Sequence, residues 1–169
     1  MLIRLTFPWG LLVQYYEIPK KFLPFLRSGG DMSVADFSPS ERALAQWLQG
    51  SEEYRNERLK LISYVPEGPW IVRNMVTGKP AIIGKKLPVT YKYTPQDGAK
   101  QDFLECELNI GGSSATARRI VSVCRRYMSA LAVDIGFVIE GKTPEELPEE
   151  MMGAIRIHEV DPLKAPTIR

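Results

Sequence analysis

Hydrophobic and polar residues alternate along several segments of the chain, as they do in β-strands with one buried face. The clearest segment is 103–110, where Leu104, Cys106, Leu108 and Ile110 share one side and polar residues occupy the other. Alternating or apolar segments predict further strands at 2–7, 11–18, 70–76, 81–83, 88–93 and 154–160. Strands with one buried face and one solvent-exposed face favour an antiparallel sheet.

Capping signals predict short helices between these strands. Ser38, Pro39 and Glu41 supply an N-cap, a first-turn proline and a capping-box glutamate, so a helix is predicted to run from there to about Gln49. Similar signals predict short helices at 51–58 and 143–153.

The segment GGSSATARRIVSVCRRYMSALAVDIGFVIEG, residues 111–141, is predicted to contain one long helix from Ser113 to about Ile139. Its apolar run beyond Tyr127 is about 13 residues long, whereas a bilayer crossing needs about 20. Asp134 interrupts that run. We therefore interpret the helix as part of a soluble core, with Asp134 buried on its apolar side and hydrogen-bonded.

The first half of this predicted helix carries a basic stripe. At about 100° per residue its four arginines fall within an arc of roughly 120°, opposite an apolar side. They are Arg118, Arg119, Arg125 and Arg126. Two hypotheses remain open for the stripe: it binds lipid headgroups or a partner, or it is a solvated face paired with acidic neighbours.

Composition and motif content argue against several classes of function. The 169 residues carry a net charge of +2, which suits one domain over 1–169 and argues against a nucleic-acid binder. Cys106 and Cys124 form no CxxC pair and His158 is the single histidine, so no metal site is predicted. The sequence has no GxSxG, HExxH or GxxxxGK[ST] motif. We predict no enzyme activity, no catalytic residue and no cofactor other than a bound lipid.

Four ordered motifs occupy about the last 110 residues. They are PEGPW at 66–70, GKKLPVTY at 84–91, ECELNIGGSSA at 105–115 and a tail from 134 to 162. In this order they resemble the Enhanced Disease Resistance 2 C-terminal domain family, over about residues 54–168. Domains of that family usually begin some tens of residues earlier, so this chain is expected to lack the N-terminal portion.

The resemblance implies lipid or membrane association in the cytosol, because in plants this domain commonly follows a phosphoinositide-reading pleckstrin-homology domain and a lipid-transfer START domain. It implies no catalytic residue. The expected location is cytoplasmic and peripheral to membranes, or an organelle if a transit segment has been removed.

These observations predict an α+β fold in which a curved antiparallel sheet wraps one long helix of the C-terminal half, the START-like helix grip, with short capping helices. An apolar slot between sheet and helix makes a non-catalytic lipid-binding or membrane-associating domain the first hypothesis. The alternative is a structural accessory subunit that packs against a larger protein assembly, organellar or membrane-embedded.

Residues outside the arginine stripe complete the predicted sites. An apolar loop with two lysines is expected to contact a membrane or a partner, unless its apolar residues pack in the core. These residues are Trp9, Lys20, Lys21, Phe22 and Phe25. Structural roles are predicted for Trp70, Gly111 and Asp134.

Overall fold

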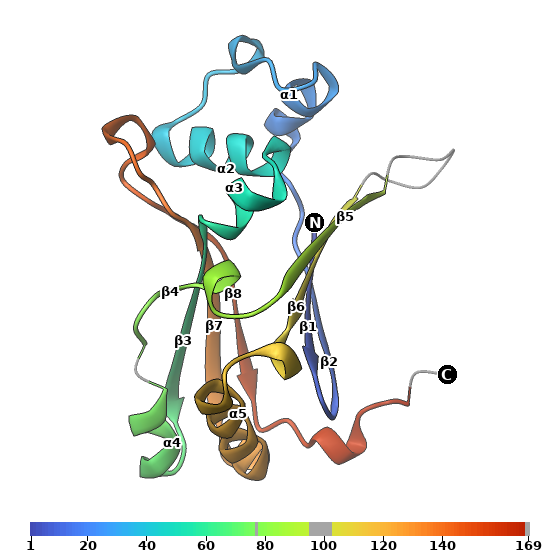
Figure 1. Ribbon diagram of the computed structural model, residues 1–169, viewed down its shortest axis with the longest axis vertical. Helices are drawn as coiled ribbons and strands as arrows, with labels where there is room; N and C mark the ends of the chain where they lie inside the picture. Colours follow the sequence, from blue (N-terminus) through green and yellow to red (C-terminus); the bar gives the residue numbers. More distant parts are fainter. Residues whose placement is uncertain (77, 95–102, 168–169) are drawn as a thin grey trace.

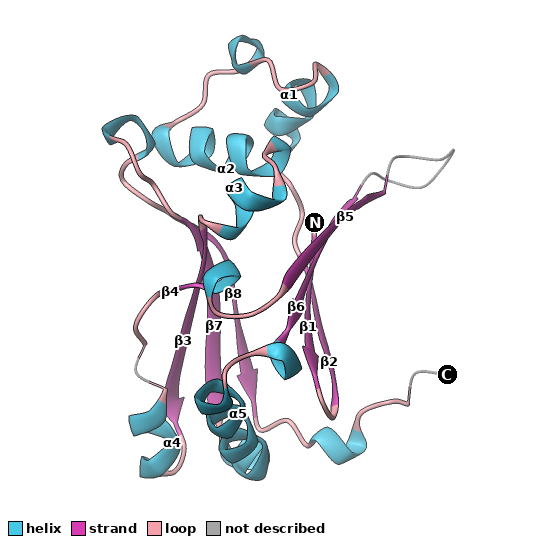
Figure 2. Ribbon diagram, in the orientation of Figure 1, coloured by secondary structure: helices cyan, strands magenta, loops and turns pink. Residues whose placement is uncertain are grey.

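Two four-stranded sheets face each other, and helices lie at both ends of the space between them (Figure 1 and Figure 2). The computed structural model describes residues 1–76, 78–94 and 103–167. The first sheet has the strand order β2-β1-β6-β5 and the second the order β4-β3-β7-β8. The strands are β1 (Leu2–Phe7), β2 (Gly10–Tyr15), β3 (Leu59–Glu67), β4 (Ala81–Ile82), β5 (Val89–Thr94), β6 (Phe103–Asn109), β7 (Ala132–Ile139) and β8 (Met151–His158).

The helices gather in two groups. At one end lie α1 (Leu23–Arg27), α2 (Pro39–Gln49) and α3 (Glu52–Asn56), and at the other lie α4 (Trp70–Met75) and α5 (Ala115–Tyr127) (Figure 1). Short 3-10 turns connect the elements. They are η1 (Lys20–Phe22), η2 (Met32–Val34), η3 (Ile83–Lys85), η4 (Ile110–Gly112), η5 (Met128–Ala130), η6 (Pro144–Glu146) and η7 (Pro162–Lys164).

The core lies between the two sheets. Ile3 of β1 and Leu108 of β6 face Phe137 of β7, and all three side chains are fully buried. Trp47 of α2 is also fully buried and closes one end of the core. The alternation along the strands explains this arrangement, because every second side chain of a strand points to the same face.

Several sequence predictions are confirmed. β1 and β2 form the expected antiparallel hairpin, and β6 buries the expected alternating side chains. The capping box of α2 is present: the Glu41 amide donates to Ser38 Oγ at 3.4 Å, and the Ser38 amide donates to Glu41 Oε2 at 2.8 Å. The fold class α+β is correct, although the β1–β6 pair is parallel within mostly antiparallel sheets.

The long helix predicted from Ser113 to Ile139 is wrong in its second half. α5 ends at Tyr127, and the apolar run beyond it forms β7, which pairs with β3 and with β8. Ala132 and Val138 point away from the core side of β7 and are nevertheless buried. A strand covered on both faces loses the alternation that would distinguish it from a buried helix.

The strand predicted at 70–76 is also wrong, because Trp70–Met75 is the helix α4. Its Ile and Val favour a strand by local preference, but Val72 packs against Val65 and Leu131 at the end of the second sheet. The helix predicted at 143–153 is limited to the 3-10 turn η6, after which β8 begins.

The predicted START-like helix grip is not confirmed. The strands form two sheets rather than one curved sheet around a long helix, and α5 lies across one end of the space between them (Figure 2). No residue of α5 is fully buried. The helix therefore closes the core at that end while one side of it faces solvent.

Candidate functional site

The four arginines of the predicted stripe lie on α5, and the structure exposes all of them. Ser114 caps the helix by accepting from the Ala117 amide at 3.2 Å. Val123 and Cys124 pack against the cluster formed by Val65, Val72 and Leu131, which fixes the buried side of the helix. The basic residues consequently face outward, as expected for an amphipathic helix.

No ion pair joins these four arginines to a carboxylate in the described part of the chain. Arg118 donates to the Ser113 carbonyl, and Arg125 lies 5.3 Å from the centre of the Trp9 ring. α5 itself contains no acidic residue. Among the described residues, the stripe therefore has no acidic neighbour paired with it, and the interpretation as a face paired with acidic neighbours finds no support there.

Three other arginines of the molecule pair with carboxylates. Arg58 pairs with Glu146 at 2.7 Å, and Arg156 pairs with Asp134 at 2.6 Å. Arg4 bonds to Glu105 on the outer face of the first sheet. In the described part of the chain, these three arginines therefore have carboxylate partners that the four arginines of α5 lack.

Helix α4, which lies next to α5, carries exposed aromatic and aliphatic side chains. The side chains of Trp70 and Ile71 are 76% and 45% exposed, and Arg73 on the same helix is also exposed. Trp70, for which a structural role is predicted, is thus mostly exposed, and Val72 is the buried residue of this helix. Gly68, with a φ of 142°, and Pro69 turn the chain out of β3 and start the helix.

We call this end of the molecule the α4–α5 surface. Its side chains are all exposed to solvent, and each is either positively charged or large and apolar. All of them belong to one of these two adjacent helices. They are Trp70, Ile71, Arg73, Arg118, Arg119, Arg125, Arg126 and Tyr127.

Trp9 borders this surface from the turn between β1 and β2. Its ring stacks on Phe7 with centroids 4.8 Å apart, and its other neighbour is the Arg125 guanidinium. Its Nε1 is buried without a hydrogen-bond partner among the described residues. Trp9, for which a contact with a membrane or partner is predicted, thus lies beside the arginines. Its ring makes a cation–π contact with Arg125.

The rest of the predicted contact loop lies at the opposite end of the molecule (Figure 1). Phe22 and Phe25 are buried against Phe37, so their predicted contact with a membrane or partner is wrong. Lys20 and Lys21 are exposed, and Lys21 pairs with Glu41 at the start of α2. The structure therefore does not join these lysines to the arginine stripe.

The two other residues with predicted structural roles, Asp134 and Gly111, have clear contacts. Asp134 makes the predicted hydrogen bonds, accepting from Arg156 Nε at 2.6 Å and from Arg156 Nη2 at 2.8 Å. It lies on a strand, and its side chain is 32% exposed, so the predicted depth of burial is wrong. Gly111 belongs to η4, where an added Cβ would lie 3.3 Å from Asn109 Oδ1.

The cysteines and the histidine occupy unrelated places. Burial raises the pKa of the Cys106 thiol to about 12 and raises that of Cys124 as well, so both thiols are protonated at neutral pH. His158 lies at an exposed end of β8, 3.6 Å from Glu67. Among the described residues, no group of histidine, cysteine and acidic side chains is arranged to hold a metal ion. None of the described helices has both the length and the apolar character of a membrane span.

The fold and this surface define an α+β domain of two facing sheets with one basic and aromatic end. The family described as Protein ENHANCED DISEASE RESISTANCE 2, C-terminal, matches residues 1–161, and the chain belongs to this family. The match begins at the first strand, well before the residues 54–168 that carry the resemblance in the sequence.

Among curated proteins, the Protein ENHANCED DISEASE RESISTANCE 2-like of Arabidopsis thaliana is 37% identical over 116 residues. The aligned part is 69% of this chain but 15% of the relative, so the chain corresponds to a small portion of that protein. No solved structure matches the chain.

Proposed function

We propose that this domain is a non-catalytic module that binds anionic membranes peripherally, in the cytoplasm, through the α4–α5 surface. The observation that carries the proposal is the set of four exposed arginines on α5 that no carboxylate of the described chain neutralises, next to the exposed Trp70. Arginine forms bidentate hydrogen bonds with phosphate, and tryptophan favours the membrane interface.

The expected strength of this contact follows from its charges. Each basic residue near an anionic leaflet contributes about 1 kcal/mol, so the four arginines contribute on the order of 4 kcal/mol. That energy alone corresponds to a dissociation constant of about 1 mM. Insertion of Trp70 and Ile71 adds apolar burial to the electrostatic attraction.

The non-catalytic part of the proposal rests on the surroundings of the reactive side chains. The two thiols have raised pKa values, and the neighbours of His158 are Glu67 and Glu159 rather than a nucleophile. Turnover of any substrate by the purified domain would contradict it.

Vesicle flotation tests the membrane contact. Wild-type protein should float with phosphatidylcholine vesicles that contain phosphatidylserine and should stay unbound with pure phosphatidylcholine. Arg125→Glu, Arg126→Glu should weaken binding at least about thirty-fold, because two attractive charges become repulsive. Binding by the wild type should also fall between 0.1 and 1 M salt, as the screening length shortens from about 10 to about 3 Å.

A matched control separates the α4–α5 surface from net charge. Lys20→Glu, Arg27→Glu changes the charge by the same amount at the opposite, exposed end of the molecule and should retain flotation. Equal flotation of the α5 double variant and the wild type, with equal melting temperatures, would overturn the proposal. It would favour the accessory-subunit alternative, in which the arginines contact acidic groups of a protein partner.

A further inference from the structure

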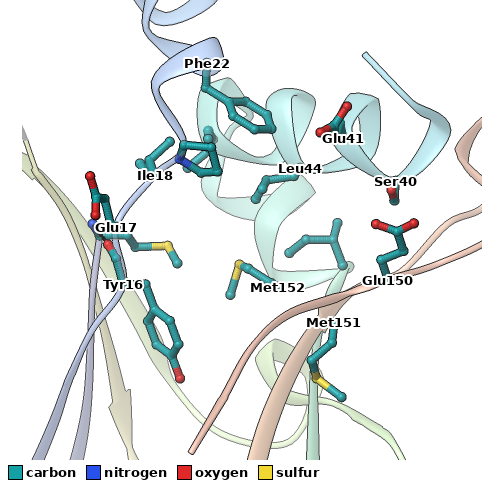
Figure 3. Close-up of a pocket in the computed structure, with 14 residues that line it drawn as sticks. Tyr16, Glu17, Ile18, Phe22, Ser40, Glu41, Leu44, Glu150, Met151 and Met152 are labelled. Atoms are coloured by element: carbon teal, nitrogen blue, oxygen red, sulfur yellow. Dashed lines mark hydrogen bonds between the residues drawn. The ribbon is translucent and has the colours of Figure 1, made fainter.

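A cavity of about 200 Å³ lies at the end of the molecule opposite the α4–α5 surface (Figure 3). It is enclosed by α2, by the segment that follows β2 and by the start of β8. Its walls are mainly apolar and include the three methionines Met1, Met151 and Met152. Its apolar lining also includes Ile18, Leu44, Leu48 and Ile139.

The floor of the cavity is built by Tyr16. Its ring meets Phe137 edge-on, with centroids 6.4 Å apart, and its hydroxyl bonds to Gln14 Oε1 at 2.5 Å. A Cβ on Gly153 would lie 2.2 Å from Tyr16 Cε1, so glycine is required for the ring to pack against β8. The cavity is therefore a fixed gap between the outer strands of the two sheets, and Met152 points into it (Figure 3).

The mouth of the cavity is acidic. Glu17, Glu41 and Glu150 line it, and no lysine, arginine or histidine does. Glu41 is engaged by Lys21 and by the cap of α2. Glu17 and Glu150 are exposed and have no ion-pair partner among the described residues.

Two cations lie close to this mouth. Lys20 is exposed on η1, and the Met1 amino group donates to the Tyr16 carbonyl at 2.7 Å. Burial lowers the pKa of that amino group, which reduces its positive charge near neutral pH. The two unpaired carboxylates of Glu17 and Glu150 thus make the opening of the cavity negatively charged.

We propose that this cavity binds the alkyl chain of a single-chain cationic amphiphile, whose ammonium group is attracted by the carboxylates of Glu17 and Glu150 on opposite sides of the opening (Figure 3). The chain would contact Leu44, Leu48 and Met152, and methionine adapts its shape to an unbranched chain. Ligand pockets usually enclose about 300–1,000 Å³, so this smaller cavity accommodates a short hydrocarbon segment rather than a two-chain lipid. The proposal goes beyond membrane binding and does not depend on it.

Calorimetric titration with octylamine, 1-octanol and octanoate tests both the chain and the charge. Octylamine is protonated at pH 7 and should bind most tightly, followed by the alcohol and then the carboxylate. In the series from pentylamine to octylamine, each added methylene should tighten binding about four-fold until the cavity is filled.

Variants assign the binding to this site. Glu17→Gln, Glu150→Gln should weaken octylamine by roughly three- to ten-fold, to the level of octanol, and leave octanol unchanged. Met152→Trp should fill the cavity and abolish binding of all three probes, with Leu44→Phe as the second variant if the first does not fold. Arg125→Glu, Arg126→Glu serves as the control and should retain octylamine binding.

Three results would overturn the proposal: no saturable octylamine binding to folded wild type, equal affinity for the three probes, or undiminished binding in a folded cavity-filling variant. A failure of vesicle flotation alone would leave it standing, because the two sites lie at opposite ends of the molecule (Figure 1).

Discussion

At the residue scale, two ion pairs, one beside the second sheet and one on it, differ in how deeply they are buried. Arg58 and Glu146 are both buried, Arg58 also lies over the Tyr54 ring, and Glu146 accepts from the Lys142 amide at 2.7 Å. Asp134 and Arg156 form a cross-strand pair at the surface. Removing one partner of a buried pair leaves a desolvated charge, whereas an exposed pair can be replaced by water.

We therefore predict that Glu146→Ala lowers the free energy of unfolding by about 3–5 kcal/mol, and that Asp134→Ala lowers it by no more than about 1 kcal/mol. Urea denaturation at neutral pH measures both. Equal losses would show that burial does not distinguish the two pairs.

The same carboxyl predicts a pH dependence. Burial acts to raise the pKa of Glu146, but the Lys142 amide, Arg58 and the Thr143 amide outweigh it, so its pKa in the folded state lies below the ordinary 4.5. The stabilisation is therefore complete above that value and is lost as pH falls through the folded pKa. Between pH 5 and 2, Glu146→Gln should lose less stability than the wild type. Parallel pH curves for the two proteins would contradict the assignment.

At the element scale, α5 and β7 follow each other along the chain and differ in how they are held. β7 is hydrogen-bonded on both edges, to β3 and to β8, and most of its side chains are buried. α5 contacts the core along one side and exposes its arginines. Elements with few buried contacts open locally, and central strands exchange only when the domain unfolds.

Hydrogen exchange followed by mass spectrometry should therefore show the slowest amides at 132–139 and faster exchange over 115–127. The capped and buried helix α2 is the internal control and should exchange more slowly than α5. Uniform protection from 115 to 139 would instead indicate the continuous helix that the local pattern predicts.

At the scale of the whole molecule, the two ends carry opposite chemistry. The α4–α5 surface is basic and aromatic, and the cavity mouth near α2 is acidic. A negatively charged membrane would thus attract one end and repel the rim of the cavity at the other. The domain would dock with the cavity directed away from the bilayer.

This orientation gives Trp70 a testable role. Trp70→Ala should leave the melting temperature unchanged, because the side chain is exposed, and should weaken vesicle binding by roughly ten-fold, because interfacial contact is lost. Trp47→Ala, in the core, is the contrasting variant and should destabilise the fold by about 3–5 kcal/mol. A lower melting temperature for Trp70→Ala would support the structural role that the sequence predicted.

The sequence by itself determined those features whose cause is local. The capping box of Ser38 and Glu41 involves residues three positions apart, and the alternation of apolar and polar residues in β6 predicts which side chains are buried. The arginine stripe could be placed on one side of a helix for the same reason, and the ordered motifs identified the family. Each of these signals is contained within a few residues or read directly from their order.

The tertiary structure decided those features that depend on distant neighbours. The apolar run at 132–139 becomes a strand because β3 and β8 are available to pair with it, and Phe22 and Phe25 are buried because Phe37 lies against them. Trp70 is exposed because only Val72 of its helix meets the core. Hydrophobicity favours burial, but the sequence does not state which partner supplies it.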